Sequence, residues 1–244
     1  MGKIKNQLYE KLKHEKLHFS LFDPENLTPE QASDLAKKVT EFGTDAIMVG
    51  GSTATNVDLV TKAIREATKL PIILFPNSAN GLSKYADAVF FMSLLNSNKR
   101  DYLIGEQVKG APIIFEHNIE PIPMGYIVIN TGEPTAVEKI AQIQRLTKEE
   151  VVNYALSAEY FGMNFVYLEA GSGAMRSVPD DIISAVKQKI NIPLIVGGGI
   201  NGPVTAIKKL DAGADIIDTG TVIERSYGKA AEIIDAVKKY KIKK

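Results

Sequence analysis

The sequence contains no cysteine, and this absence restricts the chemistry open to the protein. Thiol nucleophiles, cysteine-based zinc sites and disulfide bonds are excluded. The chain also has no excess of charge, because 29 Lys and Arg residues balance 29 Asp and Glu residues. Proteins that bind nucleic acid through a global positive field carry a surplus of basic residues. We therefore expect no nucleic-acid partner.

Long hydrophobic runs are lacking as well. No stretch approaches the roughly 18 consecutive apolar residues that a membrane span requires. The basic residues 1–16 are not followed by an apolar core of signal-peptide length. These absences predict a cytoplasmic protein. The lysine-rich residues 238–244 are typical of a solvated helix end, and transient contact with an anionic membrane surface is the alternative.

The composition is that of an ordinary globular protein. Of the 244 residues, 45% are hydrophobic and 24% are charged. A chain of this length buries enough apolar surface to fold without a disulfide or a metal. No low-complexity linker divides it, so we predict a single domain over residues 1–244.

Short apolar runs rich in Ile, Val and Phe alternate with longer amphipathic segments. Runs of this kind, without polar alternation, are typical of strands buried on both faces. We expect strands at residues 18–22, 45–49, 71–75, 88–92, 112–115 together with 124–129, 165–168, 192–196 and 216–217. Strand and helix in alternation predict a parallel sheet with helices outside it.

The ends of the predicted helices carry clear signals. Thr28 precedes a proline, and Thr147 begins a capping box with Glu150. Gly43, Gly162 and Gly213 each stand shortly before a predicted strand, where a left-handed glycine ends a helix. About eight strands at roughly 30 residues per unit indicate a (β/α)8 TIM barrel. Residues 76–86 are too few and too rich in turn formers for a full helix, so the unit after the third strand is irregular.

Glycine-rich sequences follow the sixth, seventh and eighth predicted strands, at residues 171–173, 197–199 and 220. Active sites of such barrels lie at the carboxyl ends of the strands, and the last two loops often bind phosphate. Glycine permits close backbone approach, and exposed N–H groups hold anions. The three loops together predict a phosphate site, with plain tight turns as the alternative.

Two further strand ends suggest a magnesium site. Asp23 ends the first predicted strand, and Ser52 follows the second. A carboxylate beside a hydroxyl suits Mg2+, which keeps waters and takes other ligands from substrate phosphates. The alternative is that Asp23 caps a turn before Pro24.

Glu169 ends the sixth predicted strand beside the phosphate site. A lone carboxylate there accepts a proton or binds a substrate hydroxyl, and a salt bridge across the barrel mouth is the alternative. His14, His18 and His117 show no metal-ligand spacing, so we expect surface or packing roles for them. No serine lies in the nucleophile motif of acyl-transfer enzymes.

These motifs resemble the geranylgeranylglyceryl phosphate synthase family, which also includes heptaprenylglyceryl phosphate synthases. The resemblance covers nearly the whole chain. It rests on HFSLFDPEN at 18–26, IMVGGST at 47–53, ILFPNSA at 73–79, ADAVFFMSLLNS at 86–97, PIPMGYIVIN at 121–130, YLEAGSGA at 167–174, IVGGGI at 195–200 and DTGTVIE at 218–224. It implies a modified TIM barrel in which a loop replaces the helix after the third strand.

The resemblance implies a prenyltransferase. Such enzymes join the C3 hydroxyl of sn-glycerol 1-phosphate to a prenyl diphosphate, here geranylgeranyl diphosphate, and release diphosphate, which makes the first ether bond of archaeal membrane phospholipids. By this resemblance Asp23 and Ser52 hold Mg2+, and Glu169 is the candidate general base. Glycerol 1-phosphate would bind at Tyr167, Leu168, Glu169, Ala170, Gly171, Ser172, Gly173, Gly198, Gly199, Gly220 and Thr221. Relatives form dimers or larger assemblies, so a homo-oligomer is expected.

The prenyl chain needs a long apolar groove. Residues 90–95 and 123–126, together with the space left by the missing helix, are the candidate segments for it. Two alternatives to the prenyltransferase stay open at this point. One is another phosphate-binding barrel acting on a ribose or aminoimidazole phosphate, and the other is a non-catalytic barrel that binds isoprenoids.

Overall fold

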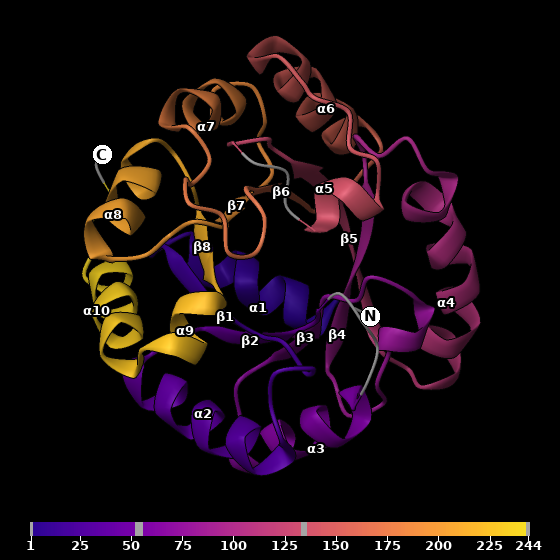
Figure 1. The fold of residues 1–244 in the computed structure, drawn as a ribbon, viewed down its shortest axis with the longest axis vertical. Helices are drawn as coiled ribbons and strands as arrows, with labels where there is room; N and C mark the ends of the chain where they lie inside the picture. The colour runs from indigo at the N-terminus through magenta and orange to yellow at the C-terminus, as the bar shows by residue number, and fades with distance from the viewer. Residues whose placement is uncertain (1, 52–55, 133–135, 243–244) are drawn as a thin grey trace.

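The structure, a computed structural model, describes residues 2–51, 56–132 and 136–242. Eight parallel strands close into a barrel in chain order, and helices surround it (Figure 1). The strands are β1 Leu17–Phe22, β2 Ala46–Val49, β3 Ile72–Leu74, β4 Ala88–Leu94, β5 Glu120–Val128, β6 Phe165–Glu169, β7 Leu194–Gly197 and β8 Ile216–Thr219. The predicted TIM barrel is confirmed.

The helices mostly follow the strands one by one. They are α1 Lys3–Leu12, α2 Pro29–Phe42, α3 Val57–Ala67, α4 Glu106–Glu116, α5 Ala136–Ile140, α6 Lys148–Tyr160, α7 Asp180–Lys187, α8 Pro203–Asp211, α9 Thr221–Arg225 and α10 Tyr227–Lys238. Both predicted threonine caps form complete capping boxes, at Thr28 with Gln31 and at Thr147 with Glu150. None of the described helices is long and apolar enough to cross a membrane.

The unit between β3 and β4 departs from the barrel pattern, as predicted. Its one described helical segment is the single 3-10 turn Ala79–Gly81. Without a helix here, the outer face of β3 and β4 is left for α4 and this turn to cover. Loss of one barrel helix therefore creates space beside the strands.

One predicted strand segment is wrong. Residues 112–115 lie in α4, which follows a π-helical turn at Asp101–Gly105. A four-residue apolar run fits a strand and a buried helical segment equally well, so periodicity could not separate them. In the helix, Ile114 is buried and Phe115 is exposed, which is the pattern of one helical face.

The strands carry two separate apolar layers because successive side chains point to opposite faces. One layer fills the barrel interior and includes Phe19, Met48, Phe90 and Phe165. The other lies between the barrel and the helices and includes Phe22, Val49 and Leu168. The side chains named here are at most 1% exposed, and burial on both faces explains why the strands are apolar without alternation.

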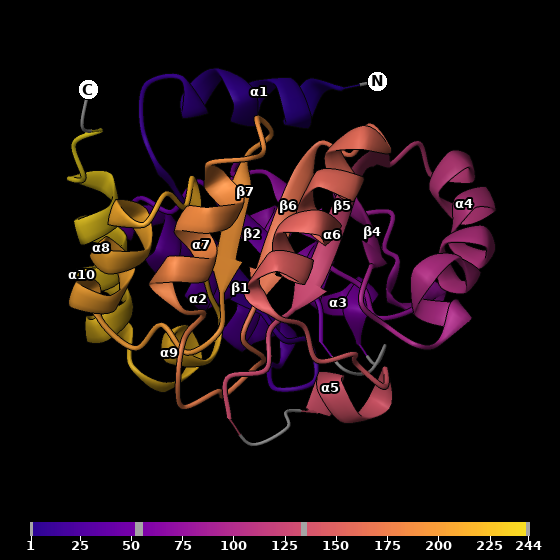
Figure 2. The ribbon, with the colours of Figure 1, turned by 90° about the horizontal axis from the view of Figure 1, so that it is seen from above.

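Helix α1 closes the amino-terminal end of the barrel (Figure 2). The carboxylate of Glu120, at the start of β5, accepts the backbone N–H groups of Ile4 and Lys5 at 2.8 and 2.9 Å. Leu8 is fully buried, and Tyr9 packs edge-on against Phe165. Since this end is covered, the carboxyl ends of the strands form the open end.

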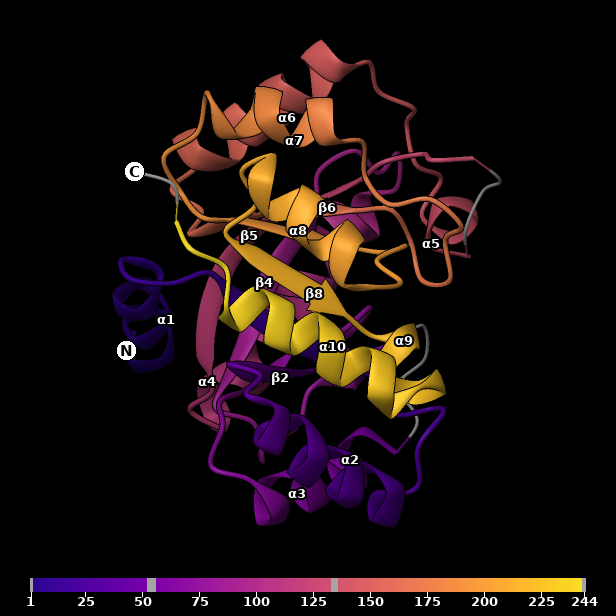
Figure 3. The same ribbon diagram turned by 90° about the vertical axis from the view of Figure 1, so that its left-hand side faces the viewer.

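Aspartates at the amino ends of strands fasten the barrel to its helices. Asp45, Asp87 and Asp215 each accept an N–H group near the start of the preceding strand, from His18, Ile72 and Leu194. Each carboxylate also forms an ion pair with one or two basic side chains. Asp45 pairs with Lys11 and Lys238, and Asp87 pairs with Arg65. Asp215 pairs with Lys16 and Lys187. The lysine Lys238 brings the C-terminal helix α10 to the start of β2, and Figure 3 shows α10 alongside the barrel.

His18 has the packing role that the sequence predicted. It is fully buried, and its two ring nitrogens lie 2.9 Å from the hydroxyls of Thr44 and Thr219. Burial lowers the pKa of His18 to about 3, so the ring is neutral at physiological pH. His14 is exposed on the helix end.

The contact between β5 and α6 depends on a missing side chain. A Cβ added at Gly125 would lie 2.6 Å from the Cβ of Ala158 and 3.1 Å from Leu95. We expect Gly125→Ala to lower the free energy of unfolding by about 1–3 kcal/mol, because overpacking forces the helix from the sheet. Gly202→Ala is the control, since Gly202 has extended backbone and nothing within 4 Å of an added Cβ. Urea denaturation of both variants checks this, and equal stability would contradict the tight contact.

Candidate active site

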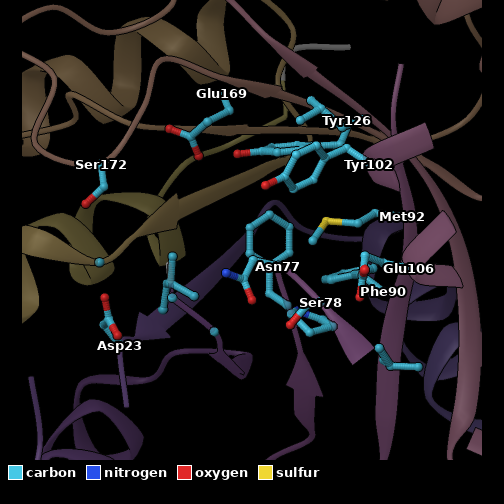
Figure 4. Close-up of a pocket in the computed structure, with 18 of the residues that line it drawn as sticks. Asp23, Asn77, Ser78, Phe90, Met92, Tyr102, Glu106, Tyr126, Glu169 and Ser172 are labelled. Carbon is cyan, nitrogen blue, oxygen red and sulfur yellow. The ribbon is translucent and has the colours of Figure 1, made fainter. Parts of the chain in front are cut away.

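Two cavities open at the carboxyl ends of the strands. The larger has a volume of about 520 Å3 and the smaller about 260 Å3. Several residues line both cavities, namely Leu21, Glu169, Ser172, Gly173, Gly220, Thr221 and Arg225. The two cavities are therefore parts of one site, and Figure 4 shows the larger of them.

Most of the predicted phosphate-site residues meet at the smaller cavity. Glu169, Ser172, Gly173, Gly198, Gly199, Gly220 and Thr221 all line it. The hydroxyls of Ser172 and Thr221 face each other at 3.5 Å across the loops that follow β6 and β8. Chain segments about fifty residues apart thus form one pocket, as the strand-end argument predicted.

Four of the predicted contacts, Tyr167, Leu168, Ala170 and Gly171, line neither cavity. The side chains of Leu168 and Ala170 belong to the layer between the barrel and the helices. They alternate with Tyr167 and Glu169 along β6, so they point to the opposite face. Any contact of these two residues with a ligand is limited to the backbone.

The pocket offers backbone N–H groups to an anion. Within the described part of the chain, the N–H groups of Gly173, Gly199 and Gly220 donate no hydrogen bond. Gly199 has a φ of +66°, and a Cβ there would lie 2.6 Å from the backbone of Arg176. Free donors in a left-handed, closely packed loop make a cradle for a phosphate group.

Glu169 is the buried carboxyl group of the site. Only 6% of the residue is exposed, and its Oε1 accepts the N–H of Gly171. Burial raises the pKa of Glu169, although hydrogen bonds from Tyr167 and Gly171 lower it in part. A Cβ at Gly198 would lie 2.3 Å from Oε1, so that glycine makes room for the carboxylate. A raised pKa makes Glu169 a stronger base than an exposed glutamate.

A second buried carboxyl group lies close by, and the sequence analysis assigned it no role. Asp218 on β8 accepts the hydroxyl of Tyr167 at 2.7 Å, and it lines the smaller cavity. Burial raises the pKa of Asp218 to about 8. Tyr126 packs edge-on against Tyr167, and both rings contact Phe75. Position alone could have identified Asp218, because it directly precedes the glycine-rich end of β8.

Asp23 lies at the edge of the larger cavity. Its Oδ1 accepts the N–H of Glu25 at 3.0 Å, so the turn-capping alternative describes part of its role. Ser52 lies outside the described residues. Glu224 is a neighbour that the sequence analysis missed, and its Oε1 accepts the N–H of Asp23 at 3.4 Å. Burial, and to a smaller extent the charge of Asp23, raises the pKa of Glu224.

The charges of the site are mostly negative. Arg225 is the one basic side chain among the described residues that line the two cavities. The described residues contain no cluster of three or more His, Asp or Glu side chains that could hold a metal ion. The pair Asp23 and Glu224 could still hold a cation that takes its other ligands from water and from a bound phosphate.

The larger cavity continues into an apolar arm. Its walls include Phe90, Met92 and Leu94 of β4, and Tyr102, Gly110 and Ile114 beside them. Leu82, just after the 3-10 turn, lies opposite α4 in the space of the missing helix. Figure 4 shows Phe90 and Met92 in this arm, with Asp23 and Glu169 in the polar part of the site. Residues of the predicted segment 90–95 thus line the apolar arm, and Tyr126 lines the same cavity.

Known proteins resemble this chain over nearly its full length. The model of the PcrB family matches residues 10–241. The geranylgeranylglyceryl phosphate synthase of Thermococcus sibiricus is 51% identical over 230 residues, which is 93% of this chain and 90% of that protein. The enzyme of the same name from Thermococcus kodakarensis is 49% identical, with 96% of each chain covered.

A solved structure is also similar. The structure of (S)-3-O-geranylgeranylglyceryl phosphate synthase from Thermoplasma acidophilum with its substrate sn-glycerol-1-phosphate has a TM-score of 0.93 and 38% identity. The match covers 98% of this chain and all of that chain. These matches confirm the family recognised from the motifs, and the chain belongs to the PcrB family.

Proposed function

We propose that the chain is a Mg2+-dependent prenyltransferase. It joins the C3 hydroxyl of sn-glycerol 1-phosphate to C1 of a prenyl diphosphate, with geranylgeranyl diphosphate as the donor, and releases diphosphate. One observation carries the proposal: a phosphate cradle, a buried carboxylate and an apolar arm share one site. The names of the relatives and the substrate in the related structure support it.

Glycerol 1-phosphate fits the smaller cavity. Its phosphate would accept the free N–H groups of Gly173, Gly199 and Gly220, and the hydroxyls of Ser172 and Thr221 could add to them. Glu169 lies between the two cavities because it lines both. The glycerol hydroxyls then extend toward Glu169 and toward the larger cavity.

The prenyl diphosphate fits the larger cavity. Its apolar chain would lie in the arm between β4, α4 and Leu82. Its diphosphate would lie in the polar part, near Asp23, Glu224 and Arg225. Arg225 is suited to contact either phosphate group, since it lines both cavities and a guanidinium binds phosphate oxygens in pairs.

The residues present fit a magnesium ion. Gly51 lies so close to Asp23 that a Cβ would be 2.2 Å from Oδ1, which leaves room beside the carboxylate only because the residue is glycine. Asp23 and Glu224 would hold the ion, and Ser52 remains a predicted ligand outside the described residues. When bound, Mg2+ neutralises charge on the leaving diphosphate.

The chemical step needs one base and close positioning. Glu169 accepts the proton of the C3 hydroxyl while that oxygen forms a bond to C1 of the prenyl chain. The bond from C1 to the diphosphate oxygen breaks, and diphosphate leaves with the electron pair. Two substrates fixed in adjacent cavities react as an effectively unimolecular pair, and this positioning supplies much of the acceleration.

The product joins a polar phosphate to a long apolar chain. We propose that the protein works in the cytoplasm and passes this product on through transient contact with a membrane surface. A homo-oligomer remains our expectation for the assembly.

A transfer assay tests the function directly. Radiolabelled glycerol 1-phosphate is incubated with prenyl diphosphates of increasing length, with and without Mg2+, and the extracted lipid is measured. We expect a Mg2+-dependent ether lipid with geranylgeranyl diphosphate as the donor. Binding of prenyl diphosphate without transfer would favour the non-catalytic barrel, and turnover of a ribose phosphate instead would favour the other alternative enzyme.

Glu169→Gln tests the base. Glutamine keeps the shape and the hydrogen bond from Gly171 but cannot accept a proton, so we expect turnover to fall about 10²-fold or more. Binding of glycerol 1-phosphate, measured by calorimetry, should weaken much less. In the wild type, kcat/KM should fall as the pH drops through the raised pKa of Glu169, because only the carboxylate is a base. Glu232→Gln on the exposed face of α10 is the control, and near-normal turnover of Glu169→Gln would refute the assignment.

Asp23→Asn tests the metal. The amide oxygen can still accept the N–H of Glu25, so the turn and the fold should persist. We expect turnover to fall about 10- to 100-fold and the Mg2+ concentration for half-maximal activity to rise, since one charged ligand is lost. Circular dichroism and thermal melting check the fold. Full activity of this variant, or activity unaffected by EDTA, would show that Asp23 binds no metal in the reaction.

A further inference from the structure

The proposed reaction uses one buried carboxyl group and leaves a second one without a role. Asp218 is 2% exposed, at the end of β8, in the wall of the smaller cavity. Its Oδ2 accepts the hydroxyl of Tyr167 at 2.7 Å. Its Oδ1 is buried and has no hydrogen-bond partner among the described atoms. A buried carboxylate with an unpaired oxygen is costly, whereas a protonated carboxyl group is much less so.

The Tyr167 side chain interacts with both carboxyl groups. Its hydroxyl donates to Asp218 at 2.7 Å. Tyr167 also stands two residues before Glu169 on the same face of β6, and a hydrogen bond from it lowers the pKa of Glu169. A phenol has one proton to donate. Asp218 and Glu169 therefore compete for the one proton that Tyr167 donates.

The surroundings hold this hydroxyl in place. A Cβ at Gly197 would lie 2.0 Å from the Tyr167 oxygen, so β7 leaves a gap that the hydroxyl fills. The Tyr167 ring is fully buried, with ring centroids 5.3 Å from Tyr126 and 5.5 Å from Phe75. The tyrosine therefore cannot turn toward one carboxyl group without disturbing its neighbours.

We propose that Asp218 is a positioning residue for Glu169. By taking the Tyr167 hydroxyl as its own donor, it leaves the Glu169 carboxylate free to accept the proton of the acceptor substrate. The role in catalysis rests on the proposed function, but the hydrogen-bond competition is a property of the chain alone.

The charged groups around Asp218, Tyr167 and Glu169 agree with this role. Glu169 and Tyr167 face Asp218 from β6, and Tyr126 adds a phenol from β5. On the β1 side, His18 is neutral because burial lowers its pKa to about 3. Burial raises the pKa of Asp218 to about 8, and the charge of Glu169 adds to this shift. Asp218 is therefore uncharged near pH 7, and it does not repel a phosphate group in the cavity that it lines.

Three variants separate the proposal from a merely structural role. Asp218→Val removes the acceptor, so Tyr167 donates to Glu169 alone and the pKa of Glu169 should fall by about one pH unit. Tyr167→Phe removes the donor, so the pKa of Glu169 should rise. Asp218→Asn keeps an acceptor without a charge, so below pH 7 the pKa of Glu169 should stay near that of the wild type.

The measurement is a pH titration of the side-chain carboxyl carbon of Glu169 in protein labelled with 13C-glutamate, without substrate. The resonance is assigned by its loss in Glu169→Gln. Opposite shifts of the titration midpoint in Asp218→Val and Tyr167→Phe are the expected result. Shifts in the same direction, or no shift in Asp218→Val, would overturn the proposal. If Asp218→Val does not fold, Asp218→Asn serves as the test. The Glu169 resonance of the wild type should show a second titration step near pH 8, where Asp218 ionises, and Asp218→Asn should lack this step. A second step that persists in Asp218→Asn would overturn the proposal.

Turnover of the same variants tests whether this hydrogen-bond competition affects the reaction. At pH 7, Asp218→Val should lose about three- to tenfold in kcat, because a weaker base transfers the proton less well, and Asp218→Asn should restore most of it. The KM for glycerol 1-phosphate should change less than kcat in Asp218→Val. Normal kcat with a shifted midpoint would overturn the catalytic role. Absence of transfer in the wild type would instead refute the proposed function. The titration would still test the competition between Asp218 and Glu169 for the Tyr167 hydroxyl.

Discussion

The proposed function depends on one carboxyl group that is almost fully buried, that of Glu169. Glu169 is held at the end of β6, where the N–H of Gly171 stabilises it and water is largely excluded. Burial raises its proton affinity, which a base requires, but it also destabilises the charged form. Gly197 at the end of β7 and Gly198 after it leave room for the Tyr167 hydroxyl and the Glu169 carboxylate. The rest of the site is arranged around this group.

The barrel provides the site by closing one end and opening the other. Helix α1 covers the amino ends of the strands, and the aspartates there satisfy strand N–H groups and fasten the helices. The glycine-rich loops gather at the opposite end. Beside the missing helix, the larger cavity extends along β4 as an apolar arm. A polar substrate and an apolar one can thus approach the same carboxylate from different sides.

The sequence predicted the features that depend on local pattern. Threonine caps, strand-ending glycines and apolar runs identified the barrel, and the short segment after β3 located the missing helix. Residues 112–115 were misassigned because four apolar residues have no measurable period. Leu168 and Ala170 belonged to a contiguous motif, but alternate residues of a strand face opposite ways. Glu224 and Arg225 became visible only in three dimensions, because Asp23 and the walls of the two cavities come from distant strands.

In the proposed reaction, two substrates meet at Glu169 from separate cavities. A crystal structure with glycerol 1-phosphate and an unreactive prenyl diphosphate analogue bound together would test this arrangement. We expect phosphate oxygens within hydrogen-bonding distance of the N–H groups of Gly173, Gly199 and Gly220, and the C3 hydroxyl beside Glu169. We also expect the prenyl chain between β4, α4 and Leu82. A prenyl chain outside that arm, or a glycerol phosphate whose C3 hydroxyl faces away from Glu169, would contradict the proposed arrangement.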